Sequence, residues 1–207
     1  MFLSIILVAL ACYFLGNHNG AICVSLMMGD DVRQHGSGNA GLPNFIRSYG
    51  TGRALLVILI DVFKAILACW LAGAMLAPYG YGLEGRVLGG VCVMLGHDFP
   101  ALQGFRGGKG ILSGWFAAFM VDWRIGLIIG AVFFLAYLLT QYVSLGSVLA
   151  AVTFGVCFVL LYYDNLWVCC GGIFMSVLTM FMHRANIARL VKGEERKTNL
   201  FKRGVEK

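Results

Sequence analysis

A short segment of glycines and basic residues, Phe105-Arg106-Gly107-Gly108-Lys109-Gly110, has the composition of a phosphate-binding loop. Glycines allow the backbone to approach a ligand and to present N–H groups, and a helix that starts after such a loop adds the positive end of its dipole. Arg106 and Lys109 supply full charges for phosphate oxygens. The segment lacks the Walker spacing of nucleotide-binding loops, so an ordinary basic loop explains it equally well when it is considered alone.

A second polar segment lies upstream and offers further donors for an anion. Ser37-Gly38-Asn39, together with Asn44 and Arg47, combines hydroxyl, amide and guanidinium groups. Two anion-binding loops on one face of a protein favour a ligand that carries one or two phosphates. Further polar segments interrupt the apolar pattern at residues 96–100, 142–147 and 183–195.

These polar segments exclude several kinds of chemistry. They contain no nucleophile elbow and no Ser-His-Asp order. The H-x-x-x-x-D signature of several acyltransferase families is also absent, because the fifth residue after His97 is Leu102. An enzyme with this sequence would therefore transfer a group directly between two bound substrates. His97 and His183 have no carboxylate or cysteine at ligand spacing, so neither a metal nor a cofactor is expected.

The residues between the polar segments are those of a membrane protein. The chain has 207 residues, of which 59% are hydrophobic and 13% are charged, and its mean hydropathy is +0.81. Soluble domains are about 45–50% apolar and about 25% charged. A span needs about 20 apolar residues, or fewer in short or re-entrant segments, and the apolar runs of this chain predict about seven transmembrane helices. They occupy residues 3–28 (with a polar interruption at 16–20), 54–77, 87–102, 111–121, 125–139, 143–161 and 166–182. We therefore expect an all-α integral membrane bundle that forms a single domain over residues 1–207.

The distribution of basic residues predicts the orientation of this bundle. With seven spans, the first, third and fifth loops share a side with the C-terminal segment. The loops carry three, two and no Lys or Arg residues and the C-terminal segment carries eight, so this side holds 13 of the 16. The eight are Arg184, Arg189, Lys192, Arg196, Lys197, Lys202, Arg203 and Lys207. Because Lys and Arg are retained in the cytoplasm, the N-terminus is expected outside, and the C-terminus and all the polar segments at the cytoplasmic face.

Two other features bear on the class of protein. The basic residues are scattered among apolar segments and form no stripe with interleaved aromatics, which argues against nucleic-acid binding despite the net charge of +6. Asp61 and Lys64 lie three residues apart inside the second predicted span, so they share one face of its helix. Ionisable groups within a membrane are costly and are usually paired or functional. These two side chains are therefore either a structural ion pair or a direct contact to a substrate.

At these residues the sequence resembles the bacterial acyl-phosphate:glycerol-3-phosphate acyltransferase family. The signatures of that family look like GSGN-x-G-A-T-N-x-x-R, then GH-x-F-P with F-K-GGKG, then H-R-x-N-I-x-R-L-x-x-G-x-E. This chain matches all three in order and adds the Ser-Leu-Gly-Ser segment at 144–147. It departs at Leu42-Pro43, where the family has Ala-Thr, and at Arg106, where the family has Lys. The resemblance covers the whole chain.

The resemblance implies transfer of a fatty acyl group from acyl phosphate to the 1-hydroxyl of glycerol 3-phosphate, the first step of phospholipid synthesis. The products would be lysophosphatidate and phosphate. Acyl phosphate is already activated, so no covalent enzyme intermediate is required. The protein would be a multi-pass protein of the inner (plasma) membrane with its active site on the cytoplasmic face. Its partners would be these two substrates and the lipid bilayer.

The family's functional residues transfer to this chain through the matched motifs. Those implied for catalysis are Arg47, Lys109, His183 and Asn186, which with Arg189 would hold the glycerol phosphate. Those implied for the acyl phosphate are Ser37, Asn39, Gly107, Gly108, Ser144 and Ser147. The remaining substrate-binding candidates are Asn44, His97, Arg106, Gly110 and Glu194. The hydroxyl proton would pass either to the donor's own phosphate or to His183.

A membrane transporter of an organic phosphate is the alternative function. Such a protein should have polar groups near the membrane midplane, broken helices and an internal repeat. Only Asp61 and Lys64 are clearly intramembrane, and no repeat is visible in the sequence. A structural scaffold would leave the converging motifs unexplained.

Overall fold

The computed structural model describes residues 1–198, and the helices found there are joined by short loops and turns, with no strand in that range. The α-helices are α1 Phe2–Gly16, α2 Gly20–Met27, α3 Leu42–Tyr49, α4 Ala54–Leu76, α5 Gly82–Asp98, α6 Ile111–Val121, α7 Trp123–Thr140, α8 Val143–Leu161, α9 Leu166–Met182 and α10 Arg184–Lys192. Three short 3-10 turns are η1 Val32–Gln34, η2 Ala77–Tyr79 and η3 Ala101–Gln103. The predicted all-α architecture is confirmed for the described residues. Lys202, Arg203 and Lys207, which entered the charge count, lie outside them.

The structure supports three to five membrane spans. Residues 54–79 (α4 with η2), α7 and α8 are each long and apolar enough to cross a bilayer. The pairs α1–α2 and α9–α10 also qualify if each is taken as one span, although they bend by 47° and 57°. Helix α6 has 11 residues, which at 1.5 Å per residue is about 16 Å and is shorter than a hydrocarbon core of about 30 Å. The expected count of seven spans stays a prediction.

Most helix bounds agree with the apolar runs of the sequence, and the exceptions have local causes. The runs at 111–121, 143–161 and 166–182 coincide with α6, α8 and α9. The third run was expected to reach residue 102, but α5 ends at Asp98 because Pro100 disfavours helical geometry in the residue before it, and Phe99 has φ −126° and ψ 64°. The first run breaks after Gly16, and Asn19 then caps α2 by accepting a hydrogen bond from the N–H of Ile22 at 3.1 Å.

Close backbone contacts hold α5 against two neighbouring helices. A Cβ on Gly89 would collide with the carbonyl oxygen of Ala68 on α4. A Cβ on Gly96 would collide with the carbonyl oxygen of Tyr13 on α1. Small residues at such crossings let helix backbones approach closely, which is the usual basis of helix packing in membranes. The end of α5 that carries His97 is thereby fixed between α1 and α4.

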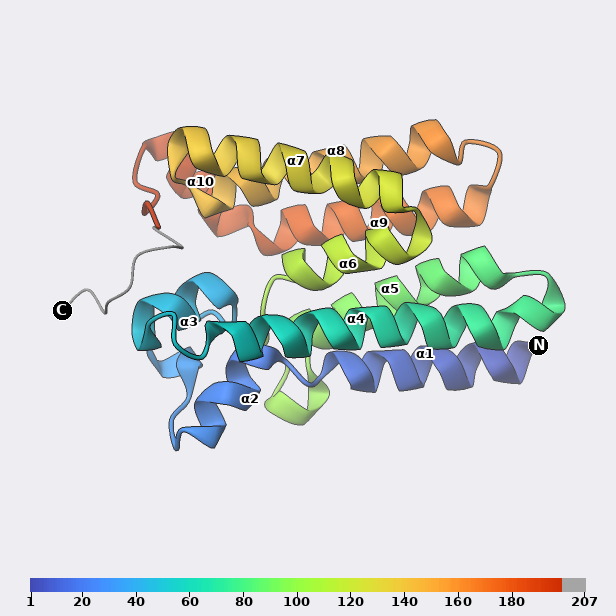
Figure 1. Ribbon diagram of the computed structural model, residues 1–207, viewed down its shortest axis with the longest axis horizontal. Coiled ribbons are helices and arrows are strands. Elements are labelled where there is room, and N and C mark those ends of the chain that lie inside the picture. The colour runs from blue at the N-terminus through green and yellow to red at the C-terminus, as the bar shows by residue number, and fades with distance from the viewer. Residues whose placement is uncertain (199–207) are drawn as a thin grey trace.

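The polar segments of the sequence gather at one end of the bundle. Figure 1 shows α3, α10 and the loop that follows α2 at the left end, where the described part of the C-terminal segment also lies, and the loop that follows α5 in the left half but nearer the middle. The turns after α4, α6 and α8 lie at the opposite end, together with the N-terminus. A helical bundle with all its motif loops at one end can assemble a site from segments that are distant in sequence.

Candidate active site

A cavity of about 690 Å³ opens among the motif loops and the adjoining ends of the helices. It has a polar part and an apolar part. Twelve of the residues predicted from the sequence line it: Ser37, Asn39, Asn44, Arg47, His97, Lys109, Gly110, Ser144, Ser147, His183, Asn186 and Arg189. The structure therefore brings together side chains from all the polar segments.

The apolar wall of the cavity was not predicted from the sequence. It includes Trp115 and Phe116 of α6 and Phe133 and Phe134 of α7. The Trp115 indole is held in place because its Nε1 donates to the carbonyl oxygen of Gly126 at 2.7 Å. No sequence signal separates these aromatic residues from those that face lipid, because both kinds lie on apolar helices. The wall can accommodate a hydrocarbon chain next to the polar groups.

A chain of polar contacts joins the glycine loop to α10. Lys109 Nζ donates to Asn186 Oδ1. Asn186 Nδ2 in turn donates to Glu195 Oε1 at 2.7 Å, and Arg189 Nε donates to Glu195 Oε2 at 2.6 Å. Two cations thus lie near each other in the cavity wall with a carboxylate between them. This arrangement suits a ligand whose negative charge can be shared by Lys109 and Arg189.

The acidic member of this cluster is Glu195, so Glu194 is the wrong choice from the sequence. Glu194 is exposed and does not line the cavity. Gly193 ends α10 with φ +73°, a left-handed conformation that reverses the chain and returns Glu195 to Arg189. The spacing of the family motif, with the acidic residue two positions after the glycine, was the signal that identifies Glu195.

Burial and neighbouring groups shift the pKa values of Lys109 and Glu195. Burial of the ammonium group, followed by the nearby charge of Arg189, lowers the pKa of Lys109 to about 8. Burial opposes ionisation of Glu195, but hydrogen bonds from Asn186 and Arg189 outweigh it and lower the pKa of the carboxyl. At neutral pH Glu195 is ionised and Lys109 is largely protonated. A bound phosphate would favour the protonated lysine further.

His183 lies where α9 ends and α10 begins, and it is buried. Its Nδ1 is 2.9 Å from the carbonyl oxygen of Thr179. Because a carbonyl can only accept, Nδ1 carries the hydrogen, and Nε2 of the neutral ring is an acceptor. The orientation of this ring is therefore set by the last turn of α9.

Asn44 has a different role from most of the predicted residues. Its Nδ2 donates to the carbonyl oxygens of Val32 at 3.1 Å and His35 at 3.0 Å. Its Oδ1 accepts from the N–H of Ser37 at 2.9 Å. Both amide hydrogens are thus used to fold the 31–47 loop. Asn44 borders the cavity, but these contacts make it a residue that shapes the loop.

The glycines of the 105–110 loop also differ from expectation. The N–H of Gly107 donates to the carbonyl oxygen of Asp98 at 3.2 Å, and that of Gly108 to the carbonyl oxygen of His97 at 3.0 Å. A Cβ on Gly108 would collide with His97 Nε2. Neither glycine lines the cavity, nor does Arg106, which is exposed. Gly107 and Gly108 are required for close packing against α5, and their N–H groups are not available to a phosphate.

Pro43, at the departure from the family motif, lies in the first turn of α3. An amide N–H in that turn has no partner within the helix, so the proline removes no intrahelical hydrogen bond. Leu42 and Pro43 both line the cavity. The substitution therefore changes the cavity surface without disrupting the helix.

Asp61 and Lys64 form the predicted ion pair. Lys64 Nζ lies 2.7 Å from Asp61 Oδ1 and 2.7 Å from Nδ1 of His97, and all three side chains are buried. Nδ1 also lies 3.4 Å from Asp61 Oδ1, but it cannot accept from lysine and donate to aspartate at once. We assign it as the acceptor because the contact to Lys64 is much the shorter. Asp61 and His97 border the cavity as well, and their contact with a substrate stays a prediction.

Comparison with known proteins supports these observations over nearly the whole chain. A family model described as glycerol-3-phosphate acyltransferase matches residues 6–193. The glycerol-3-phosphate acyltransferase of Finegoldia magna is 36% identical over 198 residues, which cover 95% of this chain and 97% of that protein. The enzyme of the same description from Clostridioides difficile is 36% identical over 197 residues, which cover 94% and 95% of the two chains.

Two crystal structures have the same fold. Both are of PlsY (YgiH), described as an integral membrane glycerol 3-phosphate acyltransferase. Its glycerol 3-phosphate form matches with a TM-score of 0.83 at 28% identity, covering 96% of this chain and 100% of that chain. Its lysophosphatidic acid form matches with a TM-score of 0.80 at 28% identity, covering 95% and 96%. Fold, motifs and sequence agree that the chain belongs to the integral membrane glycerol-3-phosphate acyltransferase family.

Proposed function

We propose that this glycerol-3-phosphate acyltransferase takes its acyl group from an acyl phosphate and transfers it to the 1-hydroxyl of glycerol 3-phosphate. The products are lysophosphatidate and inorganic phosphate. The observation that carries the proposal is a cavity in which cationic and hydroxyl side chains adjoin an aromatic wall. Such a cavity fits two phosphate groups and one hydrocarbon chain. The break between α1 and α2 is a feature that transporters also have, but a transporter of an organic phosphate would not need the aromatic wall that adjoins the cations.

The polar part of the cavity divides between the two substrates. Arg47, Lys109, Asn186 and Arg189 would hold the phosphate and hydroxyls of glycerol 3-phosphate. Ser37, Asn39, Ser144 and Ser147 would contact the phosphate of the donor, whose acyl chain would lie along Trp115 and Phe133. Glu195 orients Asn186 and Arg189 through the hydrogen bonds described above. The two substrates repel each other, and the cations make their close approach favourable.

The reaction needs no enzyme nucleophile. The 1-hydroxyl oxygen attacks the carbonyl carbon of the acyl phosphate, and the bond from that carbon to the phosphate oxygen breaks. The proton of the hydroxyl passes either to the departing phosphate or to Nε2 of His183, which is an acceptor in the neutral ring. The second route requires the histidine to lie within hydrogen-bond reach of the hydroxyl.

The donor is tested directly with purified full-length protein in detergent. Labelled glycerol 3-phosphate is incubated with acyl phosphate, acyl-CoA or acyl carrier protein that bears the same acyl group. We expect labelled lysophosphatidate with acyl phosphate and little product with the thioesters. Product from a thioester alone would refute the donor while leaving the acyltransferase activity in place. Labelled glycerol 3-phosphate that crosses a bilayer without being acylated would support the transporter.

We further propose that residues 1–207 act as one domain in the plasma membrane, with the N-terminus outside and the cavity at the cytoplasmic face. The charge distribution supports this orientation. A reporter fused after Lys207 should be active only in the cytoplasm, and a tag before Met1 should be accessible from outside intact cells. A C-terminal reporter accessible only from outside would refute the orientation.

Lys109 should bind phosphate in its protonated form. Lys109→Ala removes a charge-assisted contact of about 1.5–3 kcal/mol, so kcat/KM for glycerol 3-phosphate should fall at least about tenfold. In the wild type, kcat/KM should decline as the pH rises through about 8, because the lysine loses its charge there. Lys109→Arg should move this decline to higher pH, since arginine stays protonated.

Steady-state kinetics between about pH 6 and 10 provide the measurement. Lys192→Ala is the matched control, because Lys192 is an exposed lysine on α10 outside the cavity. An unchanged decline in Lys109→Arg, or wild-type kinetics in Lys109→Ala, would contradict the assignment.

Glu195 and Glu194 provide a matched pair of neighbouring carboxylates. Glu195→Gln removes the charge that pairs with Arg189, so kcat/KM for glycerol 3-phosphate at pH 7 should fall about tenfold, the effect of losing a hydrogen bond to a charged group. Glu194→Gln should leave it within about twofold, because that side chain is exposed. Equal effects of the two substitutions would show that the contacts of Glu195 have no role in turnover.

A further inference from the structure

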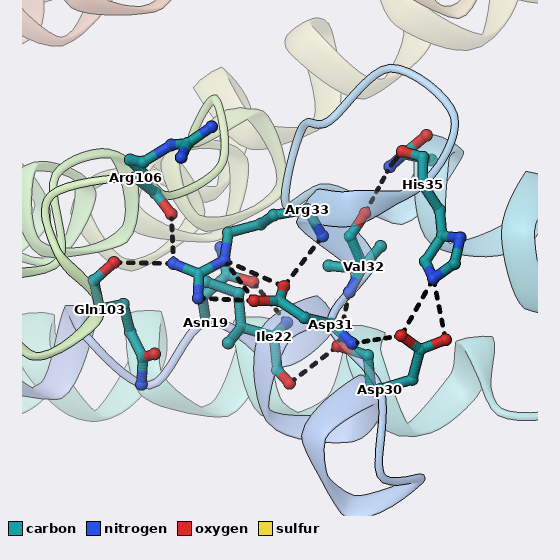
Figure 2. A network of polar contacts seen from close by, with 11 residues as sticks. Asn19, Ile22, Asp30, Asp31, Val32, Arg33, His35, Gln103 and Arg106 are labelled. Carbon is teal, nitrogen blue, oxygen red and sulfur yellow. Dashed lines mark hydrogen bonds and ion pairs between the residues drawn. The ribbon is translucent and has the colours of Figure 1, made fainter.

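Asp31 and Arg33 form a side-chain fork at the start of the first motif loop. Asp31 caps η1 by accepting from the N–H of Arg33 at 2.9 Å. The guanidinium then returns to the same carboxylate, with Nε at 3.0 and 3.1 Å from its two oxygens and Nη2 at 2.8 Å. Figure 2 shows this pair beside the backbone of Gln103 and Arg106. The carboxylate neutralises the guanidinium and fixes its plane.

The remaining nitrogen of the guanidinium connects two motif loops. Arg33 Nη1 donates to the carbonyl oxygen of Gln103 at 2.7 Å and to that of Arg106 at 3.3 Å. Gln103 belongs to the segment that links α5 to the glycine loop and Arg106 belongs to that loop, so both carbonyls lie about 70 residues along the chain from Arg33. A longer bond from the N–H of Ala40 to the carbonyl oxygen of Gly107, at 3.4 Å, is a further contact between the same loops. The loop that carries Ser37 is therefore attached to the one that carries Lys109.

A second fork in the same chain shows what is particular to Arg33. Arg124 N–H donates to Asp122 at 2.9 Å, and its guanidinium lies 2.6–3.1 Å from that carboxylate, so the local geometry is the same. However, the Arg124 side chain is 57% exposed, compared with 19% for Arg33. It lies in the α6–α7 turn, at the opposite end of the bundle from the cavity. The Asp–Arg motif thus occurs twice. At Arg33 the nitrogen Nη1, which does not contact the aspartate, donates to the backbone of a distant loop.

We propose that Arg33 is a positioning residue for acyl transfer: its guanidinium, oriented by Asp31, sets the position of the Lys109 loop relative to the Ser37 loop. The proposal rests on the proposed function, because those loops hold the two phosphates. Arg33 itself does not line the cavity. Its planar fork can bind a carboxylate and two carbonyls at once, which a lysine ammonium does not reproduce. Small displacements of groups that align substrates reduce turnover strongly.

The test compares Arg33→Gln, Arg33→Lys and Arg124→Gln in the full-length enzyme, with wild type assayed first on acyl phosphate. Arg33→Gln should lower kcat by about tenfold or more and Arg33→Lys should not rescue it, whereas Arg124→Gln should stay within about twofold of wild type. The thermal midpoints of Arg33→Gln and Arg124→Gln should be similar. A decrease in kcat that Arg124→Gln shares, or a decrease that follows a loss of folded protein, would overturn the proposal.

A double mutant tests whether Arg33 acts through the glycine loop. If it does, adding Arg33→Gln to Lys109→Ala should reduce kcat/KM by less than about twofold, because the group that it positions is already missing. Losses that multiply would show that Arg33 acts independently of Lys109 and would refute the proposed role.

Hydrogen exchange gives a readout that does not depend on the donor. The amides of residues 99–110 should exchange faster in Arg33→Gln than in Arg124→Gln or wild type, without any substrate present. Unchanged exchange would overturn the tether even if activity fell. If wild type is inactive with acyl phosphate and active with another donor, the proposed donor fails, and the same kinetic comparison is made with the active donor.

Discussion

The chain can break between α1 and α2 because the buried ion pair of Asp61 and Lys64 forms hydrogen bonds with the backbone groups that the break leaves without helical partners. Within a membrane, backbone groups that leave a helix must find partners inside the protein. Lys64 Nζ donates to the carbonyl oxygens of Gly16 at 3.3 Å and His18 at 3.2 Å, and Asp61 Oδ1 accepts from the N–H of Gly20 at 3.0 Å. The cation thus binds the carbonyls at the end of one helix, and the carboxylate binds the start of the next.

The rest of the cavity end depends on this break. It directs α2 away from the axis of α1 by 47°, so that the 29–53 segment covers the end of the bundle. Asn19, at the break, also donates to the carbonyl oxygen of Ala40 at 2.9 Å. His97 on α5 contacts Lys64 and so joins α5 to this polar cluster. Polar contacts among α1, α4 and α5 therefore support the 31–47 loop and the 99–110 loop. The guanidinium of Arg33 makes a separate connection between these two loops.

Two cations of the cavity wall, Lys109 and Arg189, share one polar network. Lys109 and Arg189 belong to one network with Asn186 and Glu195, so each cation has a partner within the protein while both lie near one carboxylate. The lowered pKa of Lys109 reflects the same arrangement, since burial and a neighbouring guanidinium both disfavour a second positive charge. A phosphate bound beside Lys109 would offset the repulsion between its charge and that of Arg189. In the proposed function, the binding of substrate would therefore also relieve this charge repulsion.

Much of the fold and most of the candidate site could be predicted from the sequence, because the relevant signals are local or are carried by motifs. Apolar runs located α6, α8 and α9, and the gathering of the motif loops at one end follows from the order of the helices. Asp61 and Lys64 were expected on one helix face because they lie three residues apart, and the ion pair was one of the two roles that this spacing allowed.

Tertiary structure alone decided how the polar groups are shared. The N–H groups of Gly107 and Gly108 are taken by α5, the amide of Asn44 by its own loop, and the arm of Arg33 by carbonyls about 70 residues away. The aromatic wall was likewise invisible in apolar helices. A residue's type and spacing show which bonds it is able to make. The choice among those bonds depends on distances between segments that are far apart in the chain, which only packing determines.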